Sequence, residues 1–148
     1  MQYEPLSWPV GWQHGWPPTR LARFLMGIPI LGGQNKAFRF ICDQLDSRHP
    51  DCLRTWGNNP RRREVSDTAS AIFQEWLGWR NSLFIPGDPF EIVCWDHTAY
   101  GIDHLSGEGA IRDVGKKFGF RDTVIFWEEC RKLTYGEVVD MIIRRHPM

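Results

Sequence analysis

Helix-start signals divide the second half of this chain into short segments. Asn59-Pro60 places a capping side chain before a proline, and proline is favoured at the first position of a helix. Asp122-Thr123 is a second such signal. Thr134-x-x-Glu137 is a capping box, in which each side chain bonds the backbone of the other residue. These signals predict several short helices after residue 58.

Apolar residues follow the spacing of helices between these signals. One stripe predicts a helix that starts at Pro60 and ends at Gly78; its members are Val65, Ala69, Ile72, Phe73, Trp76 and Leu77. A helix is expected from Gly107 to Phe118 with its end at Gly119, then a short helix from Thr123 and a last helix after Thr134. Between the first two helices we expect a long loop, 79–106. Within it, the composition of Phe90–Trp95 allows a strand, and a loop that includes one helical turn is favoured over it.

The first 18 residues hold too many prolines and glycines for a helix or a central strand. We expect an irregular arm held in place by Trp8, Trp12 and Trp16. A short helix is predicted over 19–26, and a longer one with Asn35 as its N-cap and its end before Pro50. The chain thus divides into a basic Trp/Pro/Gly-rich extension, 1–57, and a helical domain, 58–148.

Charge is unevenly distributed along the 148 residues, although the net charge is zero. Residues 1–63 carry nine Lys/Arg against four Asp/Glu, and residues 64–148 carry nine against fourteen, giving +5 and −5. A basic arm beside an acidic body allows two interpretations. The arm docks on the body of the same chain, or the acidic body meets a partner protein with a basic surface.

Other compositional features exclude several classes of protein. The four cysteines show no Cys-x-x-Cys spacing, and the apolar run 24–31 is far too short for a membrane span. We therefore expect a cytoplasmic protein with reduced thiols and no membrane partner. The basic triplet Arg61–Arg63 has no nucleic-acid-binding motif beside it, so no nucleic acid is expected. We expect this triplet to contact the acidic stretch 88–113, which has six carboxylates and only Arg112 against them.

Three motifs resemble the acyl carrier protein family. They are Gly101-Ile102-Asp103-His104-Leu105-Ser106, the helix end at Phe118-Gly119, and the run from Leu133 to Asp140. The resemblance covers 61–145, and only the segment between Gly119 and Leu133 is slightly longer than in the family. It implies an all-α, acyl-carrier-protein-like four-helix bundle with a long first loop and a short third helix.

In that family a serine between the Asp and the Leu carries phosphopantetheine, and here His104 takes its place. An imidazole cannot form the family's phosphodiester. The resemblance therefore implies a non-enzymatic carrier-like interaction module with no cofactor. Partners of carrier proteins approach the start of the second helix, which corresponds here to Asp103, His104, Leu105, Glu108 and Arg112. The expected partner is a protein with a basic surface.

Two alternatives remain open at this stage. In the first, the chain is a working carrier modified at Ser106, although Ser106 is also explained as the N-cap of the following helix. In the second, it is a metal-dependent enzyme that uses two Asp-His pairs, which are Asp96, His97, Asp103 and His104. No signature of nucleophilic catalysis surrounds Cys94 or Cys130.

Overall fold

The computed structural model describes residues 2–17, 19–21, 33–96 and 105–146, and these ranges contain helices but no extended strand. The elements are α2 (Gly33–Asp46), the 3-10 helix η2 (Pro50–Trp56), α3 (Pro60–Leu77), α4 (Phe90–Val93), α5 (Leu105–Phe118), α6 (Thr123–Cys130) and α7 (Tyr135–Arg145). The all-α prediction is confirmed for this part of the chain. None of the helices in these ranges is both long and apolar enough to cross a membrane.

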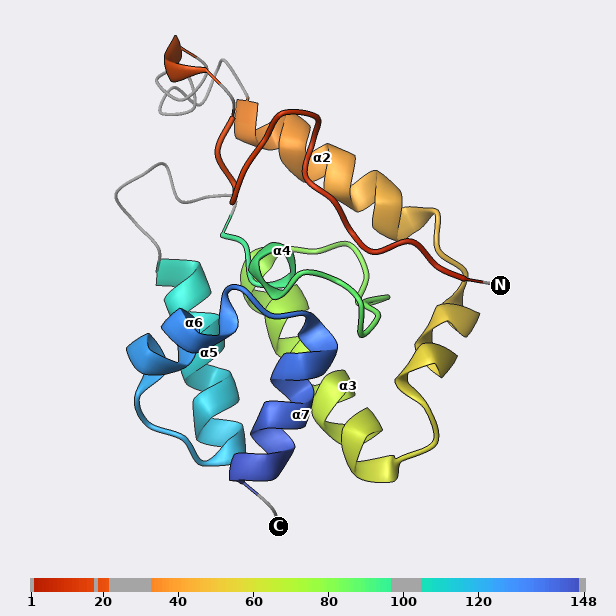
Figure 1. Cartoon of the computed structure of the whole chain (residues 1–148), viewed down its shortest axis with the longest axis vertical. Helices are drawn as coiled ribbons and strands as arrows, with labels where there is room; N and C mark the ends of the chain where they lie inside the picture. Colours follow the sequence, from red (N-terminus) through yellow and green to blue (C-terminus); the bar gives the residue numbers. More distant parts are fainter. Residues whose placement is uncertain (1, 18, 22–32, 97–104, 147–148) are drawn as a thin grey trace.

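Helix α3 packs against both α5 and α7, and α6 packs against α5 (Figure 1). The single-turn helix α4 contacts α7. Helix α2 lies at the end of the molecule away from the C-terminus, with the N-terminal arm alongside it (Figure 1). The arm and α2 therefore lie beside α4, and the longer C-terminal helices extend away from them.

Capping side chains begin three of the helices as predicted. Asn59 accepts hydrogen bonds from the amides of the first turn of α3, and Gly78 ends that helix in the left-handed conformation, φ 72°. Asp122 caps α6 through the Ile125 amide. The Thr134 and Glu137 side chains form the reciprocal capping box of α7.

Two helix starts differ from the prediction. Helix α2 begins at Gly33, before Asn35, so Asn35 is not its N-cap. Helix α5 begins at Leu105, which makes Ser106 its second residue and not its cap. The helical turn expected near Phe90 is confirmed as α4. Most of the helix predicted over 19–26 lies outside the described residues.

One hydrophobic cluster joins the N-terminal segments to the C-terminal helices. It contains Leu6 from the arm, Ile41 and Leu45 from α2, and the buried faces of α3, α5 and α7. Tyr135, which is fully buried, lies at its centre and has the rings of Trp56, Phe73, Phe84 and Phe90 around it at centroid distances of 5.1–6.2 Å. Its hydroxyl lies 2.8 Å from Ser70 Oγ and donates to the Ser66 carbonyl at 3.1 Å, so the buried polar group is satisfied.

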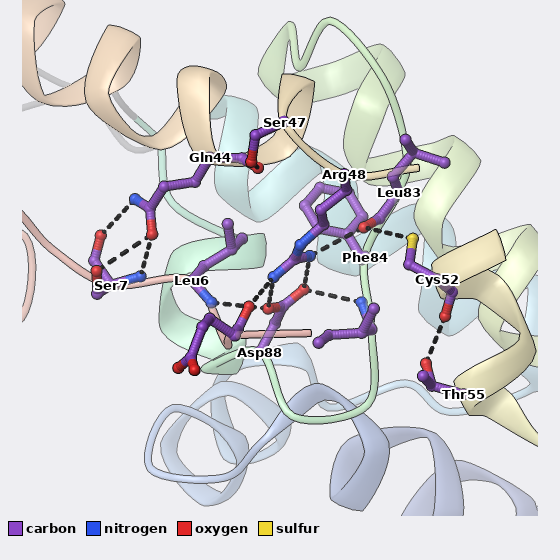
Figure 2. Close-up of polar contacts among 12 residues, drawn as sticks. Leu6, Ser7, Gln44, Ser47, Arg48, Cys52, Thr55, Leu83, Phe84 and Asp88 are labelled. Atoms are coloured by element: carbon purple, nitrogen blue, oxygen red, sulfur yellow. Dashed lines mark hydrogen bonds and ion pairs between the residues drawn. The ribbon is translucent and has the colours of Figure 1, made fainter. Parts of the chain in front are cut away.

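A buried ion pair links three segments that are distant in sequence (Figure 2). Arg48 follows α2 and donates two hydrogen bonds to Asp88, at 2.7 and 2.8 Å, in the bidentate geometry of a strong pair. Asp88 also accepts from the amides of Leu6 and Ile85, while Arg48 donates to the carbonyls of Glu4 and Leu83. Because each of the two side chains forms four hydrogen bonds, the desolvation cost of the two charges is largely offset.

Backbone hydrogen bonds fix the loop before α4 against the start of α7. The Tyr135 amide donates to the Asp88 carbonyl at 2.7 Å, and the Gly136 amide donates to the Pro86 carbonyl at 2.8 Å. A Cβ at Gly136 would lie 2.8 Å from Pro86 Cβ. The close approach of these two backbones therefore requires a glycine at residue 136.

Among the described residues, the hydrogen bonds and ion pairs of the basic triplet lie outside the acidic stretch 88–113, contrary to expectation. Arg61 pairs with Glu64, Arg62 pairs with Asp140 on α7, and Arg63 donates to the Gly57 carbonyl. The prediction was wrong because the helix that carries the triplet packs along α7, where Asp140 lies within reach. In the stretch 88–113, Asp88 instead pairs with Arg48, which lies in the segment after α2.

Candidate functional site

A cavity of about 590 Å³ lies between the N-terminal arm, the α4 segment, the first half of α5 and α6. Four tryptophans from three separate segments line it, together with charged residues of both signs. The lining residues are Trp8, His14, Gly15, Trp16, Glu91, Cys94, Trp95, Asp96, Gly107, Glu108, Ile111, Arg112, Thr123, Val124, Trp127, Arg131 and Lys132.

Helical spacing determines which side chains α5 and α6 present to the cavity. Glu108, Ile111 and Arg112 stand three and four residues apart on α5 and so share one face of that helix. On α6, Val124 and Trp127 are three residues apart in the same way. Ile111 is buried, whereas Glu108 and Arg112 are exposed. The cavity wall on this side is therefore apolar at its base and charged at its rim.

The N-terminal arm forms the opposite wall and packs against Trp95. Trp8 and Trp12 meet the Trp95 ring edge-on, at centroid distances of 5.1 and 6.4 Å. A tight turn follows, in which Gln13 and Trp16 exchange backbone hydrogen bonds. Gly15, with φ 83°, lies against the Trp95 indole, and a Cβ there would approach Trp95 Nε1 to 3.1 Å.

Glu91 on α4 holds this arm through both of its carboxylate oxygens. Its Oε1 accepts from the Trp8 indole N–H at 3.0 Å, and its Oε2 lies 2.8 Å from His14 Nδ1. The expectation that tryptophans hold the arm in place agrees with these contacts of Trp8 and Trp12. The contacts also explain why the arm can lie in a fixed position without helical structure.

The cavity's carboxylates and its basic side chains differ in how they are bonded. Glu91 is engaged by the arm, and Asp96 Oδ2 accepts from the Gly107 amide at 3.2 Å. Arg131 lies at the limit of an ion pair with Glu128, at 3.9 Å. Within the ranges that the structure describes, neither Arg112 nor Lys132 has a carboxylate partner. Among the exposed Asp, Glu, Lys and Arg residues of the cavity, three are basic (Arg112, Arg131 and Lys132) and one is acidic (Glu108).

Cys94 is buried at the cavity wall. Burial raises the pKa of its thiol well above the ordinary value, because the low-polarity surroundings disfavour the thiolate. Burial likewise raises the pKa of Cys130 to about 12. Since the thiolate is the nucleophile, both thiols are poorly reactive at neutral pH.

The structure brings together only some of the residues singled out from the sequence. Glu108 and Arg112 line the cavity, and Asp96 is buried where it meets the first turn of α5. His97, Asp103 and His104 lie outside the described residues, and Leu105 and Ser106 are the first two residues of α5. Among the described residues, no three His, Cys, Asp or Glu side chains form a group that could hold a metal ion.

Several cavity residues carried no functional signal in the sequence. Trp16, Trp127 and Lys132 line the cavity although they are far apart along the chain. The sequence predicted for Trp16 only a role in holding the arm, and it gave Trp127 and Lys132 no role. Sequence spacing does not show that an arm without regular structure packs against α4 through Trp8 and His14.

Comparison of the chain with protein-family models, with curated proteins and with solved structures finds no match.

Proposed function

We propose that this protein is a carrier-like, non-enzymatic interaction module that has lost the attachment residue for phosphopantetheine. The observation that carries the proposal is the start of α5 at Leu105, directly after His104. In the family that the sequence resembles, the modified serine stands at this position before the second helix. The order of a long helix, a loop with one helical turn, α5, a short α6 and a last helix also supports it.

The test restores the missing hydroxyl. His104→Ser recreates the family's Asp-Ser-Leu triplet with Asp103 and Leu105. We expect the wild-type chain to keep its mass when it is co-expressed with a broad-specificity phosphopantetheinyl transferase. The His104→Ser variant should gain the mass of one phosphopantetheine group, as measured by intact-protein mass spectrometry.

A second substitution assigns the site of any adduct. In the His104→Ser background, Ser106→Ala should leave the modification intact. A wild-type adduct that Ser106→Ala abolishes would contradict the proposal and favour a working carrier modified at Ser106. Failure of His104→Ser to be modified, in a variant that melts like the wild type, would count against the carrier-like resemblance itself.

The proposed partner is a protein with a basic surface that approaches the start of α5. Not every carboxylate of the stretch 88–113 is free to contact such a partner. Asp88, Glu91, Asp96 and Asp113 all accept hydrogen bonds within the chain, so the proposal depends on Glu108 and Asp103. Glu108→Lys should abolish a captured complex in a salt-sensitive way, whereas Asp43→Lys, an equal charge change on the exposed side of α2, should leave it intact.

A further inference from the structure

We infer that the cavity between the arm, α4, α5 and α6 binds a small molecule with a planar aromatic ring system and one carboxylate group. This inference goes beyond the proposed interaction function, because it concerns a ligand held inside the chain and needs no partner protein. The volume of about 590 Å³ falls within the range of roughly 300–1,000 Å³ typical of small-molecule sites.

The four tryptophans that line the cavity indicate that the ligand has a planar ring system. Trp8 and Trp16 come from the arm, Trp95 from the segment after α4, and Trp127 from α6. Trp8 and Trp95 are already fixed edge-to-face against each other, so their rings offer preorganised surfaces for another ring. Trp16 is 45% exposed although it lines the cavity. A planar ligand would cover apolar surface that the chain itself leaves open to water.

The charged side chains at the cavity indicate which polar group the ligand carries. Glu91 is already bonded to Trp8 and His14, and Asp96 already accepts from the Gly107 amide, so these two carboxylates have hydrogen-bond donors within the chain. Arg112 and Lys132 reach the same cavity and have no carboxylate partner in the part of the chain that the structure describes. Glu108, Arg112 and Lys132 are all exposed to solvent, which screens the repulsion of an anion by the one carboxylate as well as its attraction by the two cations. A carboxylate on the ligand would supply the missing partner.

A series of matched compounds tests both parts of the inference by isothermal titration calorimetry on the full-length protein. The probes are 2-naphthoate, its cationic analogue 2-naphthylmethylammonium and its saturated analogue decahydro-2-naphthoate. We expect 2-naphthoate to bind with one-to-one stoichiometry, and both analogues to bind at least about tenfold more weakly. Equal binding of the cation would overturn the charge argument, and equal binding of the saturated acid would overturn the aromatic argument.

Substitutions then locate the bound molecule. Lys132→Gln and Arg112→Gln should each weaken 2-naphthoate binding by about two- to fivefold, and more strongly at low salt. Lys117→Gln is the matched control, because Lys117 is exposed on α5 and does not line the cavity. Trp16→Ala should weaken binding about tenfold without changing the melting temperature, since Trp16 is half exposed.

Absence of 2-naphthoate binding would overturn the inference. Binding that Lys132→Gln, Arg112→Gln and Trp16→Ala all leave unchanged would overturn it as well. The outcome is separate from the test of the carrier-like function, which measures covalent modification of the His104→Ser variant. The cavity could bind its ligand whether or not the restored serine is modified.

Discussion

Cys94, Cys130 and Tyr135 lie in the core in their protonated forms. Burial is the largest cause that raises the pKa of each, and for Tyr135 it outweighs the opposing effect of the hydrogen bond with Ser70. Unfolding exposes these groups to water and lets them ionise near their ordinary pKa values, 9.0 for cysteine and 10.0 for tyrosine. Their contribution to the free energy of unfolding is therefore lost at alkaline pH.

The free energy of unfolding should fall as the pH rises from about 8 to about 11. In this range the folded state keeps protons that the unfolded state has lost, so rising pH favours unfolding. Each group contributes up to about 1.4 kcal/mol per pH unit where it is ionised only in the unfolded state. Urea denaturation at a series of pH values measures the slope, and Cys130→Ala should make the slope shallower. A stability profile that stays flat up to pH 10.5 would contradict this account.

Carboxylates are the residues whose roles the sequence predicts least well. The stretch 88–113 looks like one acidic surface, but Asp88 is fully buried, Glu91 holds the arm and Asp113 accepts from the Trp76 indole. Each of these partners is distant in sequence, so no local pattern marks it. Arg48, which neutralises Asp88, stands in an unremarkable position after α2.

Helix ends, in contrast, were largely predictable, because caps are local. The signals at Asn59, Asp122 and Thr134 each use residues within one turn, and each forms the expected hydrogen bonds. The starts of α2 and α5 were misjudged where no strong capping residue marks them. For packing, the sequence predicted which face of a helix is buried but not which element lies against it. The contact between α7 and the loop before α4, for example, has no sequence signal.

A glycine substitution tests that contact between elements. Gly136→Ala should destabilise the protein by about 1–3 kcal/mol, because its Cβ would meet Pro86 Cβ at 2.8 Å and the Pro86 carbonyl oxygen at 3.1 Å. Gly107→Ala in the first turn of α5 is the control. Its Cβ would make only ordinary contact with Asp96 at 3.5 Å, so a neutral or slightly stabilising effect is expected. Equal effects of the two changes in chemical denaturation would argue against the close packing at Gly136.

At the scale of the whole molecule, the extension 1–57 and the region 58–148 share one core. Leu6, Ile41, Leu45 and Trp56 belong to the same buried cluster as the C-terminal helices. The Arg48–Asp88 pair also crosses between the two regions, with side-chain exposures of 5% and 0%. Separating the regions would therefore remove the only cation that the described residues place against Asp88.

The effect of Asp88→Asn should depend on whether the extension is present. In the full chain this change leaves Arg48 buried without its counter-ion and should cost about 3–5 kcal/mol. In a 58–148 fragment, which lacks Arg48, the cost should fall below about 1 kcal/mol. Asp140→Asn is the control, because its partner Arg62 is present in both chains. Thermal melts followed by circular dichroism compare the four variants, and an equal cost of Asp88→Asn in both chains would refute the coupling.

The same ion pair has a consequence for the growing polypeptide. Asp88 is synthesised 40 residues after Arg48 and 82 residues after Leu6, both of which it holds. At a synthesis rate of about 5–20 residues per second, roughly 2 to 8 seconds pass between the synthesis of Arg48 and that of its partner Asp88. During that interval the guanidinium has no carboxylate acceptor, and α5 and α7, which share the core with the arm and α2, have not yet been made. The N-terminal third of the chain is thus made first but cannot complete its packing at once, and its tryptophans stay open to chaperones until the centre of the chain has emerged.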